Sequence, residues 1–486
     1  MQLVSTGATL ISSLERLGNG PASTGRALLV LAAMATLMFL SGITAPLPYV
    51  NSEQRNGEIA ATMYATGDLL VPRLEGKPHL TKPPLFHWLS YAVSCARGQG
   101  GLLSARAVSA AGAIATVLLT YLLGGLLLGR QAAWYGACLL FSSLLLFVHH
   151  GHRGTFDTTL TAFILLTLYG YASLTGERPT RARLLLVLGL AGGFLVKGPI
   201  AWILPGIPLA IDSLSRRGIR RTLRGGSLLA LAILLLSLPW YMVLVIRVPE
   251  ARQTFADALR VNFGGRSAVY DMAFHREPFH FYLWQFPLLM LPWAAFLLAL
   301  RPRKAWARIR DTKQPGTLLL HCLLWTLLFL TLVPAKASRY LVPMAPLFCL
   351  LLGQWFAVRR DHSPEELPWL RCLWVTQTVL LGIGAIAIPV LLWVRLGEPA
   401  TVWLAVGTPL AFSAAACWRW RQRVTVPLLL GAALLLPLLL VPVAYQRWIP
   451  RTHYIHEMKH SAARQAYKDR ATRLSRFLGR SERTPR

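Results

Sequence analysis

Apolar runs long enough to cross a lipid bilayer recur along almost the whole chain, and this pattern constrains the fold most. A helix needs about 20 mostly apolar residues to span the hydrocarbon layer. Of the 486 residues, 54% are hydrophobic and 14% are charged, whereas about 25% of the residues in a typical soluble domain are charged. Because the short alternating segments of a membrane β-barrel are absent from the sequence, we expect an all-α integral membrane protein.

The apolar runs predict about thirteen transmembrane helices. The fifth and sixth are separated at Lys197-Gly198-Pro199, because proline disfavours helix in the residue before it and a lysine is unfavourable at the bilayer centre. The expected spans are residues 26–45, 102–128, 131–149, 157–175, 182–197, 199–213, 226–247, 281–300, 316–334, 340–357, 370–394, 401–418 and 424–445.

These spans divide the chain into three parts. Residues 1–25 form an expected cytoplasmic segment, residues 26–445 form the transmembrane domain, and residues 446–486 form a short basic tail. The first outer loop, residues 46–101, is the longest early segment too polar to cross a membrane, and we expect interfacial helices in it. The first apolar run has no small-residue cleavage site after it, so it is predicted to remain as an anchor.

The formal charge of +30 comes mainly from Lys and Arg in short loops between apolar runs. Membrane topology explains this distribution better than a nucleic-acid partner, because basic loops favour the cytoplasmic face. Loops after even-numbered spans, such as 178–183, 216–224 and 301–313, carry many of these residues. We therefore expect a multi-pass protein of a bacterial inner membrane with its other face in the periplasm. Thirteen spans would place the basic tail on the outer face, where the charge rule does not expect it. Either the rule fails for this tail or the count is wrong by one helix.

The first outer loop contains a mixture of acids and bases suited to binding an anion and moving a proton. The stretch SEQRNGEIAATM places Glu53, Arg55 and Glu58 on a short predicted helix, which is equally explained as a solvated amphipathic helix. Further on, Lys82-Pro83-Pro84 sets a positive charge at a rigid turn before an aromatic helix start, where free N–H groups also attract anions. A lysine whose amine reaches the membrane surface is the alternative interpretation.

Other polar turns are predicted on the same side of the membrane. An aspartate at the membrane edge is unfavourable unless it is paired, so Asp157 is a candidate functional acid, although it would also suit a salt bridge to Arg153 or a helix cap. Each of the remaining turns would suit a simple interface anchor. The residues concerned are Arg153 and Asp157 in HHGHRGTFD, Lys197 in KGP, His275 in the loop before residue 281, and Lys336, Arg339 and Tyr340 in PAKASRYLVP.

Together these turns place more cations on the outer face than topology explains. Such an excess favours an anionic ligand, for example the phosphate or diphosphate of a lipid. No metal site is expected, because the histidines at 149, 150 and 152 have no carboxylate or thiol at a regular spacing. The six cysteines are scattered and indicate neither a disulfide framework nor a zinc site. Nothing in the sequence indicates an oligomeric state.

The order of these motifs resembles the polytopic GT-C glycosyltransferases that use a polyprenyl-phosphate sugar, the group of the protein mannosyltransferases and the lipid A aminoarabinose transferase ArnT. The family pattern D-E-x-R-Y-x-E-I-A is similar to SEQRNGEIA, and G-D-W-x-x-P-R-x-x-G-x-P-Y-x-x-K-P-P-L-x-x-W is similar to GDLLVPRLEGKPHLTKPPLFHW. The resemblance continues through R-x-x-x-D, K-G-P, H-x-x-P and K-x-x-x-Y-x-x-P to about residue 350.

The resemblance implies an inverting transfer of a sugar from a polyprenyl-phosphate donor to a lipid, glycan or protein acceptor, without a nucleotide sugar. The lipid-linked sugar is the donor substrate, and the sequence indicates no particular cofactor. Lys82 would bind the donor phosphate, with Arg55, Lys336 and Arg339 as plausible helpers. The leading Asp of the family pattern is replaced by Ser52, which leaves Glu53, Glu58 and Asp157 as candidate catalytic acids, with Asp157 favoured. An acceptor phosphate would need no base.

Two alternative functions stay open. One is a catalytically silent relative that binds the lipid or assists a partner enzyme. The other is a transporter, for which the expected internal repeats are lacking.

Overall fold

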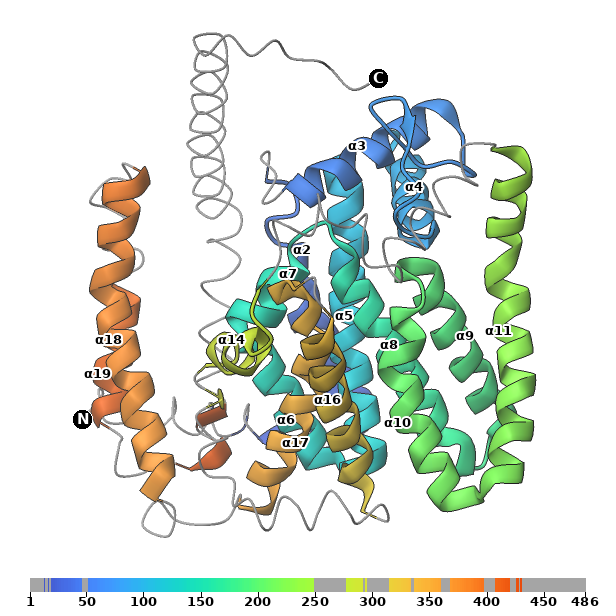
Figure 1. Ribbon diagram of the computed structural model, residues 1–486. Coiled ribbons are helices and arrows are strands. Elements are labelled where there is room, and N and C mark those ends of the chain that lie inside the picture. Colours follow the sequence, from blue (N-terminus) through green and yellow to red (C-terminus); the bar gives the residue numbers. More distant parts are fainter. Residues whose placement is uncertain are drawn as a thin grey trace, which may run out of the picture.

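The computed structural model describes residues 19–45, 51–248, 277–291, 293–294, 314–333, 336–359, 368–396 and 407–419, with a few positions near 13–16 and 425–430. Helices dominate these residues (Figure 1). His275 and the basic tail 446–486 lie outside the described residues, so the predictions made for them stay predictions.

Most helices follow the predicted apolar runs. Their bounds are α2 Thr24–Leu40, α3 Asn51–Thr66, α4 Leu85–Arg97, α5 Leu102–Leu128, α6 Arg130–Phe141, η1 Leu144–Val148, α7 His149–Gly151, α8 Phe156–Ala172, η2 Ser173–Thr175, α9 Pro179–Lys197, α10 Ile200–Arg217, α11 Ile219–Arg247, α14 Phe281–Leu289, α16 Pro315–Leu332, η4 Ser338–Leu341, α17 Met344–Val358, α18 Pro368–Leu396 and α19 Thr408–Arg419.

Three helical segments among the described residues are long and apolar enough to cross a membrane, namely Leu102–Leu128, Phe156–Thr175 and Pro179–Lys197. Shorter apolar helices cover Thr24–Leu40, Ile233–Arg247, Gly316–Leu332 and Met344–Val358. A helical protein with membrane-spanning candidates is therefore confirmed, while the count of thirteen spans stays a prediction.

The predicted single span 131–149 is divided, which corrects the sequence-based interpretation. Helix α6 ends at Phe141, and the π-helical turn η1 follows two serines. The Ser142 and Ser143 hydroxyls both donate hydrogen bonds to the Leu139 carbonyl oxygen, at 2.9 Å each. Such bonds give the backbone an alternative to the regular helix pattern, so the helix changes its winding here.

The first outer loop contains two helices, α3 and α4, as predicted, and also a small antiparallel hairpin that the all-α prediction missed. Strands β1 Arg73–Leu74 and β2 Lys77–Pro78 pair around a turn. Glu75 and Gly76 occupy this turn with φ of 51° and 76°, which is why the hairpin closes in so few residues. In Figure 1, α3 lies across the upper end of α5, with α4 beside it.

Helix α5 is the central element, and neighbouring helices approach it closely through small residues. A Cβ built on Gly112 would lie 2.7 Å from the Thr159 backbone of α8, and one built on Gly189 of α9 would lie 2.6 Å from the Thr167 backbone nitrogen of α8. Side chains at these two positions would force the helices apart. Glycine therefore allows α5, α8 and α9 to pack with their backbones nearly in contact, as membrane helices commonly do.

Candidate active site

An ion pair joins the start of α8 to the end of α9. The Lys197 ammonium donates to the Asp157 carboxylate; the Asp157 side chain is buried and that of Lys197 is largely buried. Asp157 lies in the first turn of α8 and Lys197 is the last residue of α9, so each charge also interacts favourably with the dipole of its own helix. The close packing of α8 on α9 explains how residues 40 positions apart in the sequence meet.

Helix α5 fixes the position of Asp157. The backbone nitrogen of Thr155, the N-cap of α8, donates to the Ser109 hydroxyl at 2.9 Å, and the Thr158 hydroxyl donates to the Ser109 carbonyl oxygen at 2.9 Å. A single residue of α5 thus holds the turn on both sides of Asp157. The acid is presented on rigid backbone, which is the arrangement expected of a functional side chain.

The turn that carries Lys82 lies against the turn that carries Lys197. A Cβ built on Gly198, whose φ is 75°, would be 4.0 Å from Pro83 Cγ. Lys82 is largely buried, and its pKa is lowered to about 8, first by burial and then by the nearby charges of Lys197, Arg339 and Arg55. Asp157 acts in the opposite direction and raises that pKa. Cations therefore outnumber acids around Lys82.

The 3-10 turn η4 completes this arrangement. The Lys197 nitrogen lies 4.8 Å from the centre of the Tyr340 ring, and the Arg339 guanidinium carbon lies 5.5 Å from the same centre. Both distances are within the range of cation–π attraction. We refer to Lys82, Asp157, Lys197, Arg339 and Tyr340 as the polar cluster. Four separate segments of the chain supply it, and three cations share one carboxylate.

Glu53 lies in a different environment. Its carboxylate accepts a hydrogen bond from Arg106 Nε at 2.7 Å and another from the Gly154 backbone nitrogen at 2.9 Å, and both charged side chains are fully buried. One turn later on α3, Asn56 Nδ2 donates to the Gly154 carbonyl oxygen at 2.7 Å. These contacts connect α3, α5 and the turn before α8. They favour a structural role for Glu53, and its predicted catalytic role is untested.

The other predicted residues of α3 differ in exposure and in their distance from Lys82. Glu58 is exposed and accepts a hydrogen bond from Gln54 at 3.3 Å. Arg55 is also exposed, yet it lies near enough to His79 and Lys82 for its charge to lower the pKa of both. The Ser52 hydroxyl is buried and has no hydrogen-bond partner among the described residues. Arg55 is thus the one predicted residue of α3 whose charge acts on Lys82.

Lys336 is buried and serves the end of a helix. Its ammonium donates to the carbonyl oxygens of Thr331 at 3.0 Å and Val333 at 2.6 Å, at the C-terminus of α16. It also lies 5.8 Å from the centre of the Tyr282 ring. Cations commonly satisfy the last carbonyl groups of a helix in this way, so these contacts describe a cap, and a role in substrate binding stays a prediction.

Several residues that the sequence interpretation did not select lie near the polar cluster. His150 is buried, and its pKa falls to about 3, mainly through burial and the charge of Arg153, while Asp157 opposes the shift. His87 is 1% exposed, its two ring nitrogens have no hydrogen-bond partner in the described part of the chain, and its pKa also falls to about 3. Both imidazoles are neutral at pH 7. The family pattern K-P-P-L-x-x-W leaves the position of His87 unspecified, so no sequence signal indicated this residue.

No group of three or more His, Cys, Asp or Glu side chains within the described ranges is arranged to hold a metal ion. The polar cluster has one carboxylate among several cations, which suits an anion better than a metal. Chemically, the cluster can bind a phosphate and stabilise negative charge that develops on it.

Comparisons with known proteins identify similar sequences. Residues 81–242 match the family of dolichyl-phosphate-mannose-protein mannosyltransferases. The chain is 30% identical over 409 residues to an undecaprenyl phosphate-alpha-4-amino-4-deoxy-L-arabinose arabinosyl transferase of Pseudomonas aeruginosa, an alignment covering 80% of this chain and 71% of the relative. A second such transferase, from Pseudomonas fluorescens, is 29% identical over 373 residues, covering 75% of this chain and 61% of the relative.

A solved structure has the same fold. The crystal structure of ArnT from Cupriavidus metallidurans bound to undecaprenyl phosphate aligns with a TM-score of 0.68 and 19% sequence identity, and the alignment covers 89% of this chain and 78% of that one.

Proposed function

Because the chain belongs to the family of the undecaprenyl phosphate-alpha-4-amino-4-deoxy-L-arabinose arabinosyl transferases, we propose that it is a membrane glycosyltransferase that moves a sugar from a polyprenyl-phosphate donor to a lipid, glycan or protein acceptor. The proposed reaction takes place at the periplasmic face of a bacterial inner membrane. The observation that carries the proposal is the convergence of Lys82, Lys197 and Arg339 around the single carboxylate of Asp157.

The leaving phosphate is proposed to lie beside Lys82. In the transfer, an acceptor oxygen forms a bond to the anomeric carbon while the bond from that carbon to the phosphate oxygen breaks, and its electron pair remains on the phosphate. Positive charges already held in place stabilise this product without rearranging at the moment of reaction. Lys82 and Arg339 supply these charges, and Arg55 lies close enough to assist.

Asp157 is proposed to serve the acceptor. A hydroxyl acceptor must lose a proton, and a carboxylate within hydrogen-bond distance can take it. An acceptor phosphate is already ionised and enters without that step. In both cases Lys197, bound to Asp157 and lying over the Tyr340 ring, keeps the carboxylate in one orientation. Ser52 cannot replace an acid by itself, because a serine hydroxyl needs its own base.

Transfer by the purified full-length protein tests the proposal. The donor is undecaprenyl phosphate-linked 4-amino-4-deoxy-L-arabinose, the first choice from the names of the relatives, and the acceptor is a phosphorylated membrane lipid. Lys82→Met is expected to lower transfer at least 100-fold. Lys77→Met is the matched control, because Lys77 is exposed on the hairpin five residues earlier. Equal transfer by the two variants contradicts the assignment, and lipid binding without transfer would indicate a catalytically silent relative.

A further inference from the structure

A second polar pocket lies near the opposite end of α5. It has a volume of about 170 Å³ and is lined by the segment 19–22, by Tyr121 near the end of α5, and by Arg130, Gln131 and Trp134 at the start of α6. Tyr121 follows Arg106, the partner of Glu53, by fifteen residues on one helix, a separation of about 22 Å. None of its lining residues belongs to the polar cluster, so the proposed transfer leaves it unexplained.

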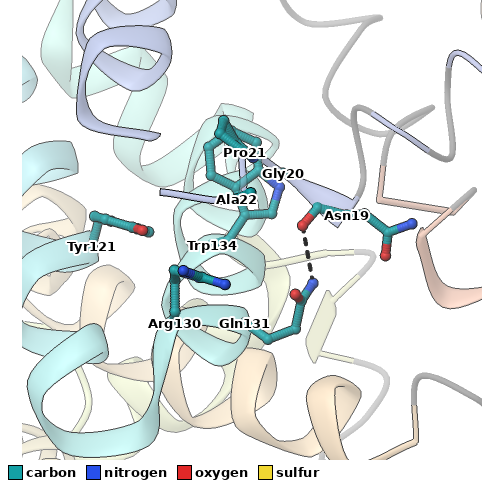
Figure 2. Close-up of a pocket in the computed structure, with 8 residues that line it drawn as sticks. All are labelled: Asn19, Gly20, Pro21, Ala22, Tyr121, Arg130, Gln131 and Trp134. Carbon is teal, nitrogen blue, oxygen red and sulfur yellow. Dashed lines mark hydrogen bonds between the residues drawn. The ribbon is translucent and has the colours of Figure 1, made fainter. Parts of the chain in front are cut away.

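Two buried polar atoms in this pocket have no hydrogen-bond partner within the described residues. They are the Tyr121 hydroxyl, on a residue that is 2% exposed, and Asn19 Oδ1. A buried phenol usually has a partner for its hydroxyl. Figure 2 shows the Tyr121 hydroxyl and the Arg130 side chain directed toward the same space below the segment 20–22. The pocket thus offers a hydroxyl donor and a cation to one small anionic ligand.

The start of α6 adds to the positive character of the pocket. Gly129 is the N-cap, with no side chain to bond the first-turn N–H groups. These groups lack carbonyl partners within their own helix, and the helix dipole is positive at this end. Phosphate groups bind at helix starts for this reason. The combination with Arg130 and the unpaired Tyr121 hydroxyl distinguishes this helix start from an ordinary one.

The pocket is held open by packing that glycine alone permits. Gly20 has a φ of 73°, and a Cβ built on it would lie 2.5 Å from Trp134 Cδ2. The backbone of the segment therefore rests directly on the indole ring. Gln131 Nε2 also donates to the Asn19 carbonyl oxygen at 3.3 Å, drawn as the dashed line in Figure 2. Packing and this hydrogen bond therefore fix the segment to α6.

We propose that this pocket binds a phosphate group, carried by a phospholipid headgroup or free in solution. Arg130 and the Tyr121 hydroxyl donate to the phosphate oxygens. The start of α9 carries the exposed residues Arg178, Arg181 and Arg183 at the same end of the bundle, and basic surfaces of this kind attract anionic lipids. The site is separate from the polar cluster and does not depend on the proposed transfer.

Binding to full-length protein tests the site. Native mass spectrometry counts bound dihexanoyl phosphatidylglycerol and dihexanoyl phosphatidylethanolamine, and equilibrium dialysis measures radiolabelled inorganic phosphate. Arg130→Gln is expected to raise the dissociation constant about tenfold, and Tyr121→Phe about fivefold. Tyr121→Phe keeps the ring in the core, so its melting temperature should not change. Arg178→Gln, which removes an exposed arginine at the same end, and Lys82→Met, in the polar cluster, are expected to retain this binding.

The source of the phosphate follows from the two measurements. If Arg130→Gln weakens the binding of inorganic phosphate in dialysis, free phosphate is a sufficient ligand. If the protein binds no inorganic phosphate and Arg130→Gln weakens the binding of lipid, the ligand is a phospholipid headgroup. Wild-type affinity in both Arg130→Gln and Tyr121→Phe overturns the proposal. Equal losses of affinity in Arg130→Gln and Arg178→Gln also overturn the proposal, because they would show that the ligand is attracted by the overall positive charge and not by the pocket.

Discussion

The Lys197 ammonium lies 4.8 Å from the centre of the Tyr340 ring while it is ion-paired with Asp157. Contacts on two sides fix this cation between η4 and α8. The Lys82 turn approaches from the first outer loop, where Pro83 lies beside Gly198. The first outer loop, the helices α8 and α9, and the 3-10 turn η4 thus lie together at the polar cluster. The predictions below test the role of this arrangement in binding and transfer.

Donor binding is expected to weaken as the pH rises. The pKa of Lys82 is about 8 in the free protein because burial and the charges of Lys197, Arg339 and Arg55 outweigh that of Asp157. A lowered lysine pKa means that the charge is present below pH 8 and lost above it. If binding requires the charged form, the dissociation constant for undecaprenyl phosphate rises about tenfold between pH 7 and pH 9. The ionisation of the phosphate itself is complete below this range.

Lys82→Arg provides the control for this titration. A guanidinium stays charged throughout the range, so the variant should bind with a nearly constant dissociation constant from pH 7 to pH 9. The same pH dependence in wild type and in Lys82→Arg would assign the effect to another group.

Asp157→Asn should reduce transfer strongly while Ser52→Ala should not. The first change removes the proposed base and leaves the buried Lys197 without its partner, and loss of a general base typically lowers the rate 100- to 10,000-fold. The Ser52 hydroxyl makes no hydrogen bond within the described structure, so its removal is expected to change the rate less than threefold. Initial rates with a lipid-linked donor measure both. A large effect of Ser52→Ala would assign the reaction to α3.

Glu53→Gln should affect stability more than chemistry. Removing one member of a buried ion pair typically costs 3–5 kcal/mol, because the other charge stays buried without compensation. Arg106→Met should be comparably destabilising, and the double variant should be less destabilised than the sum. Thermal unfolding in detergent measures these differences. If Glu53→Gln lowers the rate per folded molecule at least 100-fold with an unchanged melting temperature, Glu53 is a catalytic acid after all.

The glycines between α8 and α9 are expected to control the position of the ion pair. Gly189→Ala would place a methyl group 2.6 Å from the Thr167 backbone nitrogen, so the helices must separate, at a cost of about 1–3 kcal/mol. Transfer should fall with stability because Asp157 and Lys197 lie on these two helices. Gly125→Ala in α5 is the matched control, since its Cβ would meet nothing within 4 Å. Equal melting temperatures for the two variants would contradict this explanation.

The sequence predicted those parts of the molecule that depend on local chemistry. The helix break at Lys197-Gly198-Pro199 is confirmed, because α9 ends at Lys197 and α10 begins at Ile200. Gly198 has a φ of 75° and Pro199 follows it, and this combination favours the end of one helix and the start of the next. Lys82 and Asp157, which the sequence placed on the same face of the membrane, lie near enough for the charge of Asp157 to raise the pKa of Lys82, while their roles in the reaction stay predictions.

The remaining features depend on tertiary partners that spacing does not reveal. Glu53 looked like a catalytic acid, yet its partner Arg106 lies inside an apparently uniform apolar run, 53 residues away. Lys336 was predicted to bind phosphate, and this stays a prediction, but spacing did not reveal that its ammonium donates to carbonyl groups three and five residues before it. A charged residue that stabilises a fold and one that binds a substrate have the same sequence signature. Only the arrangement of their neighbours separates them.

The close approach of the Pro83 ring to Gly198 links two events that are usually considered separately. A carrier lipid held by Lys82 and by the end of α9 would fasten the first outer loop to the helical bundle, so donor capture and loop immobilisation must strengthen each other by the same free energy. Departure of the spent carrier then requires the loop to loosen. The slowest step of a catalytic cycle built on this contact is therefore expected to be release of the carrier.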